Sequence, residues 1–92
     1  PIAWQSRLDA NVYSHILVVG LKNREPKKLQ QYIDWALTRV RYKPRASIYS
    51  NVLLCLRVLG KHKQYQQVLL EAQILYPLVN VWGENLKLKG KT

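Results

Sequence analysis

The sequence contains few residues of the types that perform acid–base, nucleophilic or metal chemistry. Its carboxylates are scattered one to each expected helix or turn, with no pair spaced for acid–base work. They are Asp9, Glu25, Asp34, Glu71 and Glu84. The two histidines and the single cysteine lack metal-ligand spacing, and no glycine-rich phosphate loop is present. We therefore expect a protein that is not an enzyme and uses no metal or cofactor, with Cys55 as a small core residue.

Cations are abundant by comparison. Fifteen Lys and Arg stand against five Asp and Glu, which gives a net charge of +10 on 92 residues. Such an excess attracts polyanions, and nucleic acid is the first candidate. We expect the cations of two equivalent turns to form a stripe along a phosphate backbone, made up of Lys22, Arg24, Lys27, Lys61 and Lys63. The alternatives are charges that keep the chain soluble or that contact an acidic protein.

A second basic segment lies between the two expected helical pairs. There Tyr42 stands among Arg41, Lys43 and Arg45, and an exposed ring beside cations suits RNA. Arg57 lies on an otherwise apolar helix and is either a groove contact or that helix's polar face. We include these cations among the expected RNA contacts.

Length and composition indicate one small globular domain in an intracellular location. The chain has 92 residues, 48% of them hydrophobic, and one cysteine, so a disulfide framework is excluded. No signal-peptide pattern and no apolar run of membrane-spanning length is present, so we expect no membrane partner.

An internal repeat organises the chain. A shift of 36 residues aligns seven identical pairs: Tyr13 and Tyr49, Ser14 and Ser50, Leu17 and Leu53, Lys27 and Lys63, Gln30 and Gln66, Gln31 and Gln67, Ala36 and Ala72. Apolar residues recur at three- and four-residue steps within each unit, which predicts two amphipathic helices per unit. The expected helices are 12–22, 26–39, 48–59 and 63–75, with Asn11 and Ser47 as N-caps, Pro26 in a first turn and Gly60 ending a helix.

The repeat predicts an all-α solenoid of antiparallel helix-turn-helix units. Repeat 1 spans about 9–44, repeat 2 about 45–77, and a partial third repeat 78–92. Tyr13, Tyr49 and Trp82 recur at the same point of each unit, which favours packing between helices over base stacking. An exposed last helix bearing Val81, Trp82 and Leu86 is expected to need a neighbouring chain or further repeats to cover it.

The opening of each unit resembles the pentatricopeptide repeat. Pro44 lies five residues before Tyr49, and Pro77 lies five before Trp82. Leu8 holds the same position before Tyr13. The 36- and 33-residue steps between aromatics bracket the length of that repeat, and the resemblance covers about 8–86. Tetratricopeptide repeats, which are related, share the positions of Gly60, Ala72 and Pro77.

The resemblance implies a platform for single-stranded RNA on which one unit meets one nucleotide. The positions that read the base in that family correspond here to Ser14 with Arg45 and to Ser50 with Leu78. The serines fit the family pattern, whereas the family usually has Asp or Asn where this chain has Arg45 and Leu78. Contacts to phosphate or to RNA shape are therefore expected in preference to base reading.

Together these features predict an RNA-binding helical-repeat protein in an organellar, mitochondrial or chloroplast, or other ribonucleoprotein assembly. The alternative is a tetratricopeptide-like adapter that binds an acidic peptide or helix.

Overall fold

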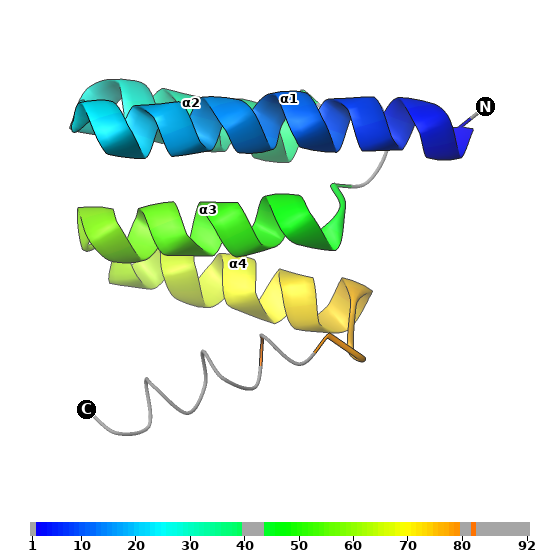
Figure 1. Cartoon of the computed structure of the whole chain (residues 1–92). Coiled ribbons are helices and arrows are strands. Elements are labelled where there is room, and N and C mark those ends of the chain that lie inside the picture. Colours follow the sequence, from blue (N-terminus) through cyan, green and yellow to red (C-terminus); the bar gives the residue numbers. More distant parts are fainter. Residues whose placement is uncertain (1, 40–43, 80–81, 83–92) are drawn as a thin grey trace.

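A computed structural model describes residues 2–39, 44–79 and 82, and this part of the chain is all-helical, without strands (Figure 1). The helices are α1 (Ile2–Asn23), α2 (Pro26–Thr38), α3 (Ala46–Leu59) and α4 (His62–Leu75). The all-α prediction is confirmed. The bounds of α2, α3 and α4 agree with the sequence pattern to within two residues.

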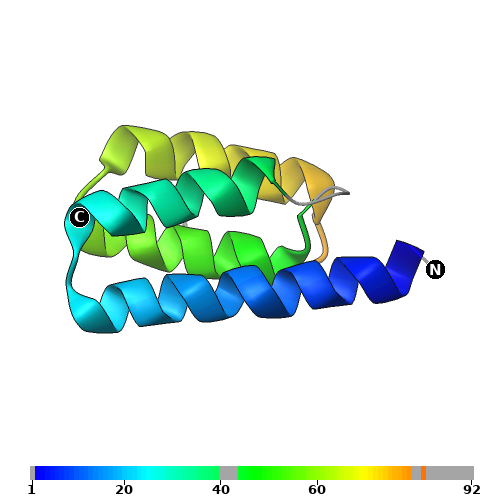
Figure 2. The same ribbon diagram turned by 90° about the horizontal axis from the view of Figure 1, so that it is seen from above.

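The helices form two antiparallel hairpins. α1 pairs with α2 and α3 pairs with α4, while α3 also packs against both helices of the first hairpin. Figures 1 and 2 show that the α1–α2 turn and the α3–α4 turn lie at the same end of the molecule. The end of α2 and the start of α3 lie at the opposite end.

Both turns use a left-handed residue at equivalent positions. Gly60 ends α3 with a φ of 71°, and its backbone N–H donates to the carbonyls of Arg57 and Leu56. Arg24, 36 residues earlier, has a φ of 52°. Among the described residues, it is the non-glycine residue that has a positive φ. Glycine adopts positive φ without the steric cost that a side chain brings. Pro26 starts α2 in the first turn, as predicted.

The core lies between the hairpins and follows the repeat. Its buried residues include three from α2 and six from α3: Leu29, Ile33, Ala36, Ile48, Tyr49, Val52, Leu53, Cys55 and Leu56. Gly20 is buried where α1 meets α2. A Cβ there would lie 3.0 Å from side-chain atoms of Leu29 and Tyr32, so the missing side chain lets the two helices approach closely.

Residues after α4 close the other end of the core. The Tyr76 hydroxyl donates to the carbonyl of Pro44, and the Trp82 indole N–H donates to the carbonyl of Tyr76 at 2.8 Å. Trp82 is only 2% exposed and Tyr49 only 1%, so the prediction that these aromatics pack is confirmed. The prediction of an exposed Trp82 is wrong, because its ring is held in the core. Val81 and Leu86 lie outside the described residues.

Two local predictions fail. α1 begins at Ile2 rather than near Val12, since no Gly or Pro interrupts the chain between them. Asn11 and Ser47 therefore lie inside helices and cap neither. Arg45, with extended backbone angles and no side-chain cap bond, is the N-cap of α3.

Candidate functional site

The end of the molecule that holds both turns is the most cationic part of the described chain. Its exposed cations come from residues 22–28 and 57–63, and we call them the basic end: Lys22, Arg24, Lys27, Lys28, Arg57, Lys61 and Lys63. Glu25 is the one carboxylate in these two segments. Its Oε2 lies 3.2 Å from Nζ of Lys28 in an exposed pair, which leaves the other cations without a nearby acid in their own segments.

The cations lie at helix ends of both kinds, C-terminal and N-terminal. Lys22 and Arg57 lie in the last turns of α1 and α3, where a cation offsets the partial negative charge of the helix C-terminus. Lys27 and Lys63 lie in the first turns of α2 and α4, which contain no acidic residue, although Glu25 is the N-cap of α2. The two stacked turns therefore concentrate positive charge at one end.

The charge of Arg57 acts on the start of α4. Burial raises the pKa of Tyr65 on α4, and the positive charge of Arg57 opposes that rise. The guanidinium thus lies close enough to the first turns of α4 to act with Lys61 and Lys63.

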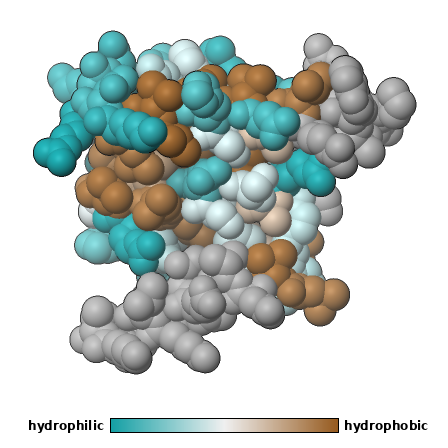
Figure 3. Space-filling model, in the orientation of Figure 1, coloured by the Kyte–Doolittle hydropathy of each residue, from teal (hydrophilic) through white to brown (hydrophobic). Residues whose placement is uncertain are grey.

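Exposed hydrophobic side chains border the basic end. Val58 is 63% exposed and Leu54 42%, and Val18 on α1 is also exposed. Figure 3 shows hydrophobic surface between two hydrophilic patches at this end of the molecule. Basic and apolar groups therefore lie beside one another at this end of the molecule.

None of the other predicted contact residues that the structure describes is part of this end. Arg45 is exposed at the start of α3, at the opposite end, where its charge opposes the burial that raises the pKa of Tyr76. Arg41 and Lys43 lie outside the described residues. Ser14 and Ser50 are half-buried, and the Ser14 hydroxyl has no hydrogen-bond partner, whereas Leu78 is 93% exposed.

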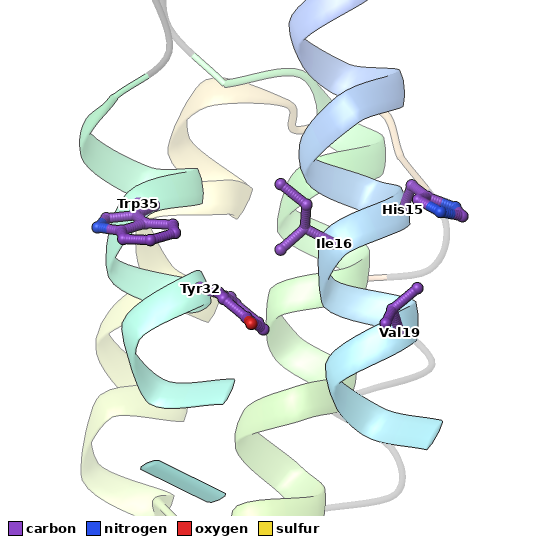
Figure 4. A pocket seen from close by; sticks show the side chains of 5 residues that line it. All are labelled: His15, Ile16, Val19, Tyr32 and Trp35. Atoms are coloured by element: carbon purple, nitrogen blue, oxygen red, sulfur yellow. The ribbon is translucent and has the colours of Figure 1, made fainter. Parts of the chain in front are cut away.

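A groove between α1 and α2 was missed by the sequence reasoning. It is lined by His15, Ile16, Val19, Tyr32 and Trp35 and has a volume of about 390 Å³. Figure 4 shows Ile16 and Tyr32 pointing into the space between the helices, with Trp35 as a wall on α2. The sequence does contain a sign of it. Val12, Ile16 and Val19 occupy the same positions of the repeat as buried residues of the second repeat, so they form an apolar face on α1.

Neither a metal cluster nor a membrane span occurs in the part of the chain that the structure describes. Its His, Cys, Asp and Glu side chains form no group of three or more that would hold a metal ion. None of its helices combines the length and hydropathy needed to cross a bilayer.

Comparison with known proteins identifies one family. The family described as the C-terminal part of a virulence factor membrane-bound polymerase matches residues 1–80 of the 92. No curated protein and no solved structure matches the chain.

This match overturns the assignment that rested on the repeat. The resemblance to pentatricopeptide and tetratricopeptide repeats is wrong as a family assignment, and with it the RNA partner, the ribonucleoprotein assembly and the acidic-peptide adapter. The physical reason is that proline-to-aromatic spacing serves the packing of antiparallel helices, as buried Tyr49 and Trp82 do here, and says nothing about a ligand.

Three further expectations are corrected by the same finding. The family is that of a polymerase, so the prediction of a protein that is not an enzyme is wrong. The family is membrane-bound, so the intracellular, organellar location and the absence of a membrane partner are wrong as well. The errors arose because the predictions used only features of this chain. Scattered carboxylates and the lack of a long apolar run do not show whether a domain is part of a membrane-bound enzyme.

Proposed function

Since the chain belongs to the family of C-terminal parts of virulence factor membrane-bound polymerases, we propose that it holds this part of the polymerase against the anionic surface of the membrane. Contact is made by the basic end. Under this proposal the contact fixes the orientation of this domain relative to the bilayer.

The observation that carries the proposal is the gathering of seven exposed cations at two stacked turns, with one carboxylate among them. Each Lys or Arg near an anionic bilayer contributes about 1 kcal/mol of attraction. The attraction needs no particular base or sugar geometry, only a dense array of phosphates. Lipid headgroups supply such an array.

The apolar border of the basic end supports the same partner. Val58, Leu54 and Val18 are exposed beside the cations. When the cations approach headgroups, these side chains meet the boundary with the acyl chains, where burial of apolar surface adds to binding. A soluble polyanion would leave them in water.

We also propose that the four helices are two stacked units of an open solenoid, with units at about 9–44 and 45–77 and a third beginning at 78. Support comes from α3, which packs against both α1 and α2, and from the two left-handed turn residues 36 positions apart. Stacking of this kind brings equivalent turns to one edge. The basic end is then a product of the repeat.

The proposal is tested by co-sedimentation of the chain with lipid vesicles. We expect binding to vesicles that contain phosphatidylglycerol, little binding to pure phosphatidylcholine, and a steep loss as salt rises. Lys27→Gln with Lys63→Gln removes two charges from the basic end and should weaken binding by about thirtyfold, since about 2 kcal/mol is lost.

The matched control removes the same charge from the opposite end. Arg39→Gln with Arg45→Gln should leave binding within about threefold of the wild type, because both residues lie away from the two turns. Equal losses in the two variants, or equal binding to both kinds of vesicle, would reject the proposal. Circular dichroism verifies that both variants keep their helices.

A further inference from the structure

The repeat register reveals a face of the first hairpin that lacks its cover. In the second hairpin Ile48, Val52 and Cys55 lie on one face of α3, at four- and three-residue steps, and are at most 1% exposed. The Cys55 thiol lies 4.0 Å from the carbonyl oxygen of Leu17 on α1. These three positions therefore form the contact by which one unit of this protein packs on the unit before it.

The equivalent positions in the first hairpin have no such neighbour in the described chain. They are Val12, which is 54% exposed, Val19, which is 37% exposed, and half-buried Ile16. Tyr32 on α2 is half-buried, whereas its equivalent Val68 on α4 is 4% exposed. The same apolar stripe is thus covered in one hairpin and open in the other.

The open stripe and the groove form one surface. Val19 and Ile16 line the groove together with Tyr32 and Trp35 (Figure 4). Leu8 is also exposed and precedes Val12 by four residues, so the stripe continues toward the start of α1 on the same side of the helix. Figure 1 shows this part of α1 extending beyond the rest of the first hairpin.

We infer that this surface is covered by an amphipathic helix from the polymerase segment that precedes α1 in the full-length protein. The helix would lie on the first hairpin as α2 lies on α3. The source of the helix rests on the family match from which the proposed function also starts, because a family of C-terminal parts implies polymerase chain before it. The geometry of the surface does not rest on it.

Two observations define the chemistry of the occupant. The groove is lined by aliphatic and aromatic groups, so the covering helix carries apolar side chains at three- and four-residue steps. The guanidinium of Arg39 lies 4.6 Å from the ring centroid of Trp35 and makes the rim of that wall cationic. A carboxylate on the occupant beside this rim completes the contact.

The test is site-specific photo-crosslinking in the full-length polymerase. Val19 is replaced by a photo-reactive amino acid, and Val58, which is more exposed but lies at the basic end, is replaced as the matched control. We expect the probe at position 19 to crosslink to peptides of the polymerase upstream of α1, and the probe at position 58 to give no such product. Crosslinks from position 19 to another protein, a second copy or lipid, or none at all, would overturn the inference.

A pair of variants separates this inference from the proposed function. Val12→Glu puts a charge into the covered stripe and should abolish the crosslink from position 19, while vesicle binding by the isolated chain stays unchanged. Lys27→Gln with Lys63→Gln should do the reverse. Because Val12 is exposed in the isolated chain, Val12→Glu leaves that chain folded, and an unchanged crosslink yield in the full-length variant contradicts the inference.

Discussion

The two hairpins repeat the same pattern with opposite outcomes. Ile48 and Cys55 of the second hairpin are buried against the first, whereas Val12 and Val19, at the same points of the repeat, are exposed. The turns differ as well, since Gly60 holds its left-handed conformation easily and Arg24 does so at a cost. The apolar pattern of a helix determines which side chains can be buried. Whether they are buried depends on a second hairpin packing on that face of the helix.

A third difference lies inside the hairpins. Gly20 of α1 corresponds to Leu56 of α3, and both are buried. The first hairpin closes by bringing two helices together over a glycine, and the second closes by filling the same space with a side chain. Equivalent positions therefore tolerate different residues, and exchanging them tests how far the two hairpins are alike.

The largest expected effect separates the covered stripe from the open one. Ile48→Ala should lower the free energy of unfolding by about 2–5 kcal/mol, because it leaves a cavity in a fully packed site. Val12→Ala, at the same point of the first repeat, should change it by less than about 0.5 kcal/mol. Urea denaturation of both variants measures the difference, and equal losses would mean that Val12 is already covered within the chain.

Thiol chemistry sharpens the same contrast. Burial raises the pKa of the Cys55 thiol from 9.0 to about 11, so near neutral pH its reactive thiolate is about a hundredfold rarer than that of an ordinary thiol. Val19→Cys in a Cys55→Ala background should react with a disulfide reagent at least about a hundredfold faster than the wild-type thiol. Similar rates would show that Cys55 is not sealed by α1.

The same shift in the pKa of Cys55 predicts how alkali affects stability. A raised folded-state pKa means that the fold favours the neutral thiol. Its stabilising contribution is complete below pH 9 and is lost as the pH rises toward 11. Cys55→Ala should therefore lose less stability than wild type between these values, measured by urea denaturation at each pH. The tyrosines with raised pKa, including Tyr49, account for the loss that remains.

Exchanging the interior residue should cost less. Gly20→Leu gives the first hairpin the residue of the second, but even a Cβ there lies 3.0 Å from Leu29 and Tyr32. Overpacking of this kind destabilises by about 1–3 kcal/mol, visible in a thermal melt. An unchanged or raised melting temperature would mean that α1 and α2 separate without penalty.

The turns give the smallest expected effect, and in opposite directions. Arg24→Gly should stabilise the chain by about 1 kcal/mol, since glycine adopts the positive φ freely. Gly60→Arg should destabilise it by a similar amount through backbone strain alone, because a Cβ at Gly60 meets no atom within 4 Å. Denaturation at high salt, which screens the change in charge, measures both variants. Stability changes of the same sign in both variants would contradict the account.

Much of the fold was readable from the sequence because its causes are local. Pro26 marks the start of α2 and Gly60 the end of α3, and the apolar steps around Leu29, Ile33 and Ala36 mark the buried face. The start of α1 was missed because an N-cap residue such as Asn11 is also acceptable inside a helix. Trp82 is buried with its indole N–H bonded to the carbonyl of Tyr76, a contact that no periodicity reveals.

The candidate site was readable only in part. The clusters at Lys22 to Lys28 and Lys61 to Lys63 are evident in the sequence, and the repeat predicts that their turns lie at one edge. The partner is not evident, because RNA, acidic proteins and anionic lipids are all attracted by the same positive charge. The family match, together with the exposed Val58, Leu54 and Val18 beside the cations, moves the choice toward a membrane.

The central claim, that the basic end faces the membrane, is tested most directly by an environment-sensitive fluorophore on single cysteines in a Cys55→Ala background. Val58→Cys carries the probe at the basic end, and Ile74→Cys carries it at the far end of α4, where the side chain is 70% exposed. With phosphatidylglycerol vesicles, the account predicts a blue shift and a gain in intensity at position 58 and no change at position 74. No change at position 58, or the same change at both positions, would contradict it.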